Sequence, residues 1–362
     1  MYIEDAKLLC CPVCRGDLHS SQIIEADADG EIVSGALDCE CGKSYAIRSG
    51  IPRFVDDTAY NRSWDYKWVE IDGGKGLNYK IIDKNDPAYR IHDLFDRNSH
   101  DGKAFAKLNG ALALDLGCGV GQYSIRMLRD CGARCVVSMD LTRGVDIFRK
   151  VMLERFPEYR RKLLLVQGNI LAMPFRNEQF DYILSLGVLM HTGKTLEAIR
   201  QAARVLRYGG EINFWVYAAA SVHNQAREPE GRGGLMTFLS FIPYQLHFAK
   251  VTAQINLFRA MPHALVVKIV RMFSSDFWYR LCTTPGIRWF GAVIFWTVKH
   301  PDKEYRFINN YDGWVNTWAE NWSEQELFPA IRSGELAIKG MSDWRVGIWA
   351  EKVSGFYPRD VI

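Results

Sequence analysis

Residues Leu112–Gly121 read LALDLGCGVG, and this stretch decides the fold. The apolar run at its start predicts a short strand that is buried on both faces. Gly117, Gly119 and Gly121 predict a tight turn that leads from this strand into a helix and lets a ligand approach the backbone. Their G-x-G-x-G spacing is tighter than the G-x-G-x-x-G of dinucleotide-binding folds, which argues against an NAD-dependent oxidoreductase. We therefore expect a ligand-binding turn in an α/β domain.

Short apolar runs recur on the C-terminal side of this turn, with segments of helical character between them. In one such segment, apolar residues from Leu196 to Leu206 recur at helical spacing, and Gly209 and Gly210 are predicted to end the helix. Strands that alternate with helices indicate an open parallel sheet with helices on both sides. The predicted strands are Cys135–Met139, Leu163–Val166, Tyr182–Leu186 and Ile212–Tyr217.

The C-terminal stretch is predicted to return to the same sheet. Ser323 and Glu326 have the spacing of a capping box that opens a helix, and Gly334 would end it. Leu336–Met341 and Trp344–Ala350 then read as two more strands. The predicted fold class is therefore α/β, with a doubly wound, mostly parallel, seven-stranded sheet.

Polar side chains follow the first three predicted strands at their ends. Asp115 lies just before the first glycine, where it can reach the amino group of a ligand. Asp140 comes about 20 residues after the turn, which suits bonding to ribose hydroxyls. Asn169 could bond an adenine edge, and Ile170 could pack on its face. Any one of these polar residues could equally belong to a solvated loop. Suitable residues at three successive strand ends, however, indicate a nucleoside site.

Residues 111–217 resemble class I S-adenosylmethionine-dependent methyltransferases, especially the small-molecule group that includes quinone-biosynthesis enzymes. The stretches that carry the resemblance are LDLGCGVGQYS, VSMD, QGNILAMPFRNEQFDYILSLGVLMH and ARVLRYGGEINFWVY. The resemblance implies a Rossmann-like fold with S-adenosylmethionine as cofactor, and that family often has Asp where Asn169 stands. It implies that the methionine end is held by Asp115, Gly117, Gly119 and Gly121, the ribose by Asp140, and the adenine by Asn169 and Ile170, with Leu186 also at the cofactor.

The resemblance also implies methyl transfer to a substrate nucleophile, which needs a general base only where that nucleophile carries a proton. His191 directly follows the fourth strand and is a candidate base or substrate contact, or else a structural histidine that caps the next helix. Tyr311 and Asp312 lie in a stretch, YDGW, that resembles a substrate-facing motif of related methyltransferases, and they are the second candidates. Tyr66 or Trp68 could cover the cofactor, or pack between modules.

Two cysteine pairs lie near the N-terminus. Cys11 and Cys14 form a C-x-x-C pair, and Cys39 and Cys41 form a C-x-C pair. Pairs on two tight turns can place four thiolates around zinc, with Cys10 as an alternative to Cys11. The stretch from CPVCRGDL to CGKSYAIRSGIPRF resembles the zinc-ribbon-like small protein that activates tRNA and translation-factor methyltransferases. Because the family's second pair is usually C-x-x-C, a β-hairpin platform with partial or no metal is the alternative.

These features divide the chain into five predicted parts. One part, the insertion at residues 221–319, is richer in aromatic and basic residues than the whole chain. This composition would suit an amphipathic substrate or shallow contact with an anionic membrane. An ordinary helical subdomain with an aromatic core is the alternative. The parts are 1–58, a zinc-ribbon-like β module; 59–105, a linker and cofactor-covering segment; 106–220, the cofactor-binding core; 221–319, a helical substrate lid; and 320–362, the last helix and two strands.

The bulk composition limits the partners that we expect. A net charge of +3 is far from the basic bias of a dedicated nucleic-acid binder, so we expect no nucleic-acid partner. The start of the sequence lacks the pattern of a secretory signal, and crowded cysteines suit a reducing compartment, so we expect a cytoplasmic protein. The leading interpretation is an enzyme that methylates oxygen or carbon of a small or amphipathic molecule. The alternatives are an rRNA or tRNA base methyltransferase that binds RNA through the zinc module, and a non-enzymatic binding protein of the same fold.

Overall fold

The computed structural model describes the chain apart from residues 56–61, 93, 220–255, 259, 286–296, 316–319, 343–345 and 355–362. The chain divides into two compact units. The first comprises Met1–Asn61, Leu94–Ala219 and Glu320–Ile362, and the second comprises Arg62–Asp93 and Ala220–Ala319. Within the ranges described, no helix combines the length and the apolar character that crossing a bilayer requires.

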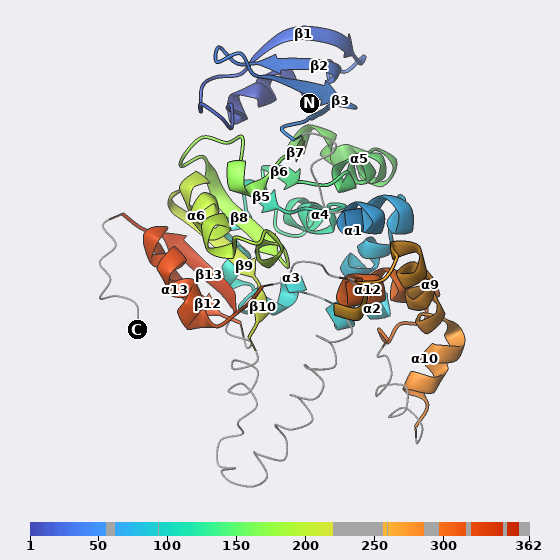
Figure 1. Cartoon of the computed structure of the whole chain (residues 1–362). Coiled ribbons are helices and arrows are strands. Elements are labelled where there is room, and N and C mark those ends of the chain that lie inside the picture. The colour runs from blue at the N-terminus through green and yellow to red at the C-terminus, as the bar shows by residue number, and fades with distance from the viewer. Residues whose placement is uncertain are drawn as a thin grey trace. The chain divides into compact units, whose positions relative to one another are not determined.

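The N-terminal part of the first unit is a four-stranded antiparallel sheet (Figure 1). Its strands are neighbours in space in their sequence order, and the 3-10 turn η1 (Ile3–Leu8) precedes them. The buried apolar side chains of this sheet, such as Leu37 and Ile47, make only a small core, so a metal cross-link would add much to its stability. The strands are β1 (His19–Ala26), β2 (Ile32–Asp38), β3 (Ser44–Arg48) and β4 (Ile51–Pro52).

The remainder of the first unit is built on a seven-stranded sheet with the order β12-β13-β9-β8-β5-β6-β7. The five strands from β9 to β7 are parallel, and β12 and β13 form an antiparallel hairpin on β9. The chain winds in opposite directions from β5, which places a topological switch point beside that strand. The bounds are β5 (Leu112–Leu116), β6 (Cys135–Asp140), β7 (Leu163–Gln167), β8 (Phe180–Leu186), β9 (Leu206–Trp215), β12 (Leu336–Met341) and β13 (Gly347–Lys352). The predicted mostly parallel α/β fold is confirmed.

Helices and short turns connect these strands. The predicted capping box at Ser323 and Glu326 is present, and α13 (Glu324–Ser333) follows it. A short parallel pair, β10 (Tyr217–Ala218) with β11 (Asn321–Trp322), joins the two chain segments that flank the insertion. The other helices of this unit are α3 (Leu94–Arg97), η4 (Lys103–Leu108), α4 (Gln122–Arg129), α5 (Gly144–Arg155), η5 (Pro157–Lys162), η6 (Ile170–Ala172), η7 (Leu189–His191) and α6 (Thr195–Val205).

The predicted end of the helix before β9 is wrong. Helix α6 ends at Val205, and Leu206 already has the extended backbone of β9. Gly209 and Gly210 therefore lie inside a strand, where the pairing with β8 jumps from Phe180–Leu206 to Tyr182–Glu211. Such a bulge accommodates extra residues in one strand, and glycine suits it because a side chain on Gly210 would clash with the backbone oxygen of Arg207 at 2.9 Å.

The described part of the second unit is helical (Figure 1). Its core is formed by the large side chains of α12, among which Tyr305, Arg306 and Trp314 are at most 1% exposed. Arg306 is tolerated there because its guanidinium donates to the backbone oxygens of Ser274, His300 and Pro301 and pairs with Asp276. The helices are α1 (Arg62–Asp65), η2 (Tyr66–Asp72), η3 (Leu77–Ile82), α2 (Pro87–His92), α9 (His263–Phe273), α10 (Asp276–Thr283) and α12 (Lys303–Val315).

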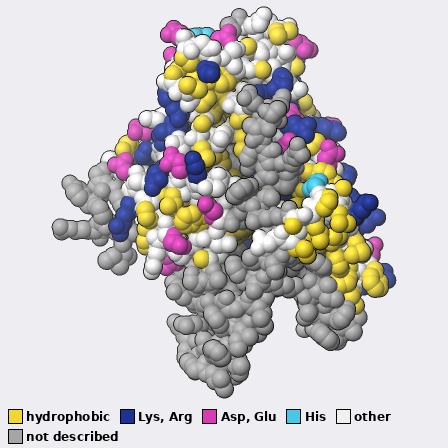
Figure 2. Space-filling model, in the orientation of Figure 1, with side chains coloured by type: hydrophobic (Ala, Val, Ile, Leu, Met, Phe, Trp, Pro, Cys, Tyr) yellow, Lys and Arg dark blue, Asp and Glu magenta, His cyan; other side chains and the backbone are white. Residues whose placement is uncertain are grey.

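The outer face of α9 and α10 is apolar and exposed. Val266 and Val270 are the buried residues of α9, whereas Leu265 and Met272 are 45% and 58% exposed. Phe277 on α10 is 75% exposed, and Figure 2 shows hydrophobic side chains gathered over these helices. Much of the predicted lid, including residues 221–255 and Trp318, lies outside the described residues.

Candidate functional site

The glycine turn between β5 and α4 has a backbone that only glycine adopts readily. Gly117, Gly119 and Gly121 have φ values of 85°, 54° and 84°. A Cβ atom on Gly117 would lie 2.2 Å from Val188, and one on Gly121 would lie 2.3 Å from the ring of Phe148. The predicted tight turn is therefore present, and Val188 and Phe148 pack against it in the space that side chains at Gly117 and Gly121 would need.

The carboxylate of Asp140 closes on this turn from the end of β6. Its Oδ2 accepts a hydrogen bond of 2.8 Å from the backbone N–H of Gly119. Its Oδ1 accepts from the N–H and the hydroxyl of Thr142, at 2.8 and 2.7 Å. The structure thus brings together the glycine turn and the acid that the sequence selected for the ribose, while Thr142 was not predicted.

Asp115 lies buried beneath the turn at the end of β5. Its Oδ2 accepts from the hydroxyl of Ser124 at 2.5 Å, and Ser138 donates to Ser124 at 2.8 Å. Burial, with a smaller contribution from the charge of Asp140, raises the pKa of Asp115 to about 7. The carboxyl group therefore titrates near neutral pH, and a ligand cation beside it would favour its ionised form. The two serines were missed, since hydroxyls in a helix and a strand give no local signal.

Asn169 and Ile170 follow β7 at the same edge of the sheet. The side-chain oxygen of Asn169 accepts from the N–H of Leu171 at 2.9 Å and caps η6. Any bond from Asn169 to an adenine edge would therefore come from its amide nitrogen. Gly168 donates its N–H to the backbone oxygen of Asp140 at 2.9 Å, so the ends of β6 and β7 are tied together. Ile170 is 8% exposed.

Leu186 and His191 lie at the end of β8 and just after it. Leu186 is the last residue of β8, and His191 lies in η7, where its ring meets the ring of Tyr217 edge-on at 5.3 Å. Lys194, not His191, occupies the position that caps α6. His191 therefore does not have the capping role considered as an alternative, and its role toward substrate stays a prediction.

Tyr311 and Asp312 lie on α12 in the second unit, each with a polar partner. The Tyr311 hydroxyl lies 2.9 Å from Nε2 of His263, and Asp312 forms an ion pair of 3.0 Å with Lys67. Burial raises the pKa of Tyr311, so its phenol stays protonated at neutral pH and suits donation better than proton removal. Lys67 packs over the ring of Trp68 at 4.2 Å. Neither His263 nor Lys67 was predicted, because each is far from α12 in sequence.

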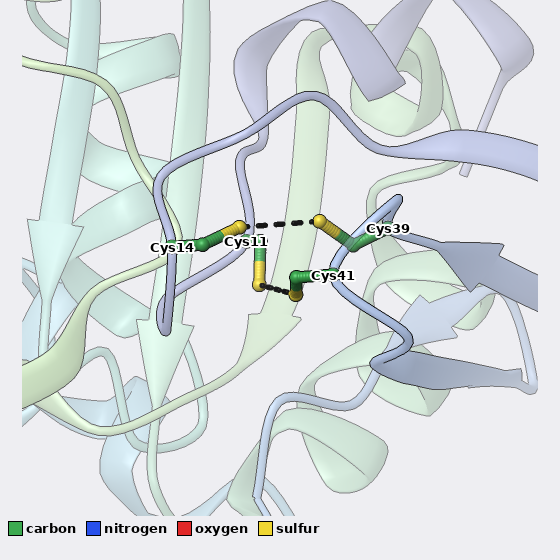
Figure 3. Close-up of side chains that lie close together, drawn as sticks. All are labelled: Cys11, Cys14, Cys39 and Cys41. Atoms are coloured by element: carbon green, nitrogen blue, oxygen red, sulfur yellow. Dashed lines mark hydrogen bonds between the residues drawn. The ribbon is translucent and has the colours of Figure 1, made fainter.

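The four predicted metal ligands converge in the N-terminal sheet. The sulfur atoms of Cys11, Cys14, Cys39 and Cys41 all lie within 4.8 Å of one another, and they point toward a common centre (Figure 3). Cys10 is not part of this cluster, and its backbone N–H bonds the oxygen of Pro174. The shorter C-x-C pair therefore does not prevent convergence, and four thiols at this spacing fit the tetrahedral sulfur set that Zn²⁺ prefers.

The thiols of the cluster differ in how readily they ionise. Burial opposes ionisation of Cys11, but hydrogen bonds from the Tyr45 hydroxyl and from the backbone of Cys14 and Val13 lower the pKa of its thiol to about 6. The Tyr45 oxygen lies 3.1 Å from the sulfur of Cys11. A backbone hydrogen bond from Cys41 lowers the pKa of the Cys39 thiol, but burial and hydrogen bonds with the other thiols raise it by more. The convergence of the four sulfur atoms, and not their ionisation, therefore indicates a metal site.

Comparisons with known proteins match the central part of the chain. Residues 114–214 match the family described as methyltransferase domain. A tRNA U34 carboxymethyltransferase from Methylococcus capsulatus is 29% identical over 163 residues, which is 43% of this chain and 49% of that protein. A demethylmenaquinone methyltransferase from Lactococcus lactis is 27% identical over 126 residues, which is 34% of this chain and 48% of that protein. The chain thus spans about half the length of these curated relatives.

A solved structure also matches over part of the chain. It is a chain from the complex between the Haloferax volcanii Trm112 methyltransferase activator and a methyltransferase. The sequence identity is 21%, the match covers 47% of this chain and 66% of that chain, and the TM-score is 0.32.

These relatives overturn one prediction made from composition. We expected no nucleic-acid partner, yet several of the relatives are named for a tRNA base. The expectation depended on net charge, which averages over all 362 residues and cannot reveal a local basic surface. The glycine turn and the matched family agree on the central part of the chain. Residues 114–214 match a methyltransferase domain, and this part of the chain contains the glycine turn.

Proposed function

We propose that the chain is an enzyme that transfers a methyl group from S-adenosylmethionine. The observation that carries the proposal is the hydrogen bond between Gly119 and Asp140, which joins an open glycine turn to a carboxylate at the next strand end. This pairing places a carboxylate directly beside the glycine turn, which is where an acid that bonds ribose hydroxyls lies in nucleoside-binding α/β folds. The matched methyltransferase domain family supports it.

Within this proposal each strand end holds one part of the cofactor. Asp115 holds the amino group of the methionine end, beside the turn made by Gly117, Gly119 and Gly121. Asp140 holds the ribose. The adenine lies against Ile170 and Leu186 and receives a hydrogen bond from the amide nitrogen of Asn169.

The chemistry asks for positioning more than for acid–base catalysis. When bound, S-adenosylmethionine supplies a methyl group on a positively charged sulfur. The strand ends hold that group in one orientation, and holding both reactants at near-attack distance provides most of the rate enhancement in such a transfer. His191 is our first candidate for contact with the acceptor, and Tyr311 and Asp312 are the second.

The cytoplasmic location of the protein also remains a prediction.

For the acceptor we propose a base of RNA as the first candidate. The relatives named for tRNA U34 support it, and so does a fused cysteine module that resembles an activator of tRNA methyltransferases. A small amphipathic molecule is the second candidate. The relative named for demethylmenaquinone and the exposed apolar side chains Leu265, Met272 and Phe277 favour it.

Transfer of a radiolabelled methyl group separates these acceptors. The protein is incubated with labelled S-adenosylmethionine and either bulk tRNA or demethylmenaquinone in detergent micelles. Label in nucleosides, lost as salt rises, supports an RNA acceptor. Label in the lipid extract supports the second candidate instead. If neither acceptor is labelled and calorimetry detects no binding of S-adenosylmethionine, the proposed function is wrong.

The affinity for S-adenosylmethionine should depend on pH through Asp115. Its pKa of about 7 means that the carboxylate, which attracts the ligand's ammonium group, is lost as pH falls. We expect the dissociation constant to rise roughly tenfold between pH 8 and pH 6. Calorimetric titrations across this range measure the effect. In the Asp115→Asn variant the affinity should be low throughout, and a pH profile equal to wild type in that variant would exclude Asp115 as the titrating group.

A further inference from the structure

Arg53 links the N-terminal sheet to the edge of the seven-stranded sheet. It follows β4 directly, forms a parallel bridge with Gln167 at the end of β7, and is 8% exposed. The next residue, Phe54, donates its N–H to the backbone oxygen of Gln167 at 2.8 Å. The last extended residues of the cysteine module thus continue the sheet beside β7, where the N-terminal sheet meets the core in Figure 1.

The guanidinium of Arg53 bonds two side chains of the core. Its Nη2 lies 2.5 Å from Oδ1 of Asp146, and its Nη1 donates to Oε1 of Gln167 at 2.9 Å. A third bond, from Nη2 to the backbone oxygen of Arg48 at 3.3 Å, ties the same group to its own module. A planar fork with several donors can hold these partners together, which a single ammonium group cannot do.

Both core partners adjoin the loops that carry the residues assigned to adenosine. Asp146 lies in the first turn of α5, directly after the loop that begins at Asp140. Gln167 is the last residue of β7, just before Asn169, and its amide nitrogen donates to the backbone oxygen of Leu141 at 3.1 Å. Arg53 therefore fixes which way this amide faces, and through it the position of the backbone next to Asp140.

We propose that Arg53 is a positioning residue for the adenosine half of the cofactor site. Through it the cysteine module acts on cofactor affinity from within the same chain. The inference depends on the proposed function, because it needs S-adenosylmethionine as the ligand. Asp115, which is assigned to the methionine half, is held differently, since it accepts from Ser124, to which Ser138 donates in turn. Loss of the Arg53 fork should thus affect recognition of adenosine.

Arg160 provides a matched control at the same interface. Its guanidinium bonds Glu31 at 2.6 Å and Asp29 at 2.7 Å, so it also joins the core to the N-terminal sheet. It also pairs with Asp27, so its partners lie between β1 and β2 or next to them, and not in the loops that carry Asp140 and Asn169. Arg160→Gln should loosen the junction and lower the melting temperature without changing cofactor affinity.

The test compares two ligands by calorimetry in four proteins. The ligands are S-adenosylmethionine and 5′-methylthioadenosine, which keeps the adenosine half and lacks the amino-acid half. Arg53→Lys is expected to weaken both ligands by about tenfold. Asp115→Asn should weaken only the binding of S-adenosylmethionine. Arg160→Gln should weaken the binding of neither ligand. In the methyl-transfer assay, Arg53→Lys should raise KM for S-adenosylmethionine and leave kcat near wild type.

The outcomes separate this inference from the proposed function. Wild-type affinity of Arg53→Lys for both ligands would overturn the inference alone, as would equal losses in Arg53→Lys and Arg160→Gln. If Arg53→Lys does not fold, Asp146→Asn takes its place, because it removes the charge that Arg53 grips and keeps the shape of the side chain. If the wild-type protein binds neither ligand, the proposed function fails first and the inference with it.

Discussion

Replacing Gly119 by valine is expected to weaken the binding of S-adenosylmethionine by at least about 100-fold, or about 2.8 kcal/mol. Gly119 has a φ of 54°, and its N–H donates to Asp140. Valine at positive φ costs about 1–2 kcal/mol of backbone strain, which a folded domain of this size tolerates. The larger effect comes from the branched side chain, which would stand where the ligand approaches the turn. Calorimetric titration measures the loss.

Gly110→Val is the matched control for backbone strain. Gly110 has a φ of 75°, nothing lies within 4 Å of a Cβ atom built on it, and it precedes the opposite end of β5. We expect this variant to lose a similar amount of stability while binding S-adenosylmethionine like the wild type. Wild-type affinity in Gly119→Val would show that the cofactor does not bind at this turn.

Removing one thiol of the cysteine cluster should release its metal and destabilise the N-terminal sheet. Cys14 and Cys41 are exposed, so Cys14→Ser or Cys41→Ser removes little packing and the effect reports on ligation. Zinc bound by four cysteines contributes about 10–16 kcal/mol in small zinc-binding peptides, and the small apolar core of this sheet cannot replace that. We expect zinc content to fall from about one ion per chain to near zero. Mass spectrometry measures the metal, and limited proteolysis within residues 1–54 measures the unfolding.

Cys131→Ser is the control for the loss of a thiol elsewhere. Cys131 is half-buried and does not belong to the cluster. The zinc content of the Cys131→Ser variant and its resistance to proteolysis should equal those of the wild type. A wild-type protein that contains no zinc after expression with excess metal, and whose proteolysis is unchanged by a chelator, would contradict a metal site here.

The sequence predicted the parts of the fold that depend on local pattern. Buried parallel strands are continuous apolar runs, so β5 and β7 were recognised within one residue of their observed bounds. Glycines that need a positive φ stand out in the same way, as Gly117 does. At β9 the pattern misled, because Leu206 continues the helical spacing of α6 while the bulge that contains Gly209 depends on pairing with β8.

The candidate site was predicted only in part, for a related reason. Asp115, Asp140 and Asn169 are recognisable because each lies at the end of a strand or just after it. Their partners are not, because a hydroxyl such as Ser124 or Thr142 has no distinctive spacing. The burial that raises the pKa of Asp115 is likewise a property of the folded domain.

By itself the sequence determined the strands, the glycine turn and the two cysteine pairs, since each is specified by residues a few positions apart. Tertiary structure alone decided that Arg53 reaches Asp146 and Gln167, and that Lys67 reaches Asp312. These partners are separated by about a hundred residues or more, and a charged side chain has no preference for one distant partner until the fold brings the two together. The same physics selected Cys11 over Cys10, because the fold brings the sulfur of Cys11 close to the other three thiols.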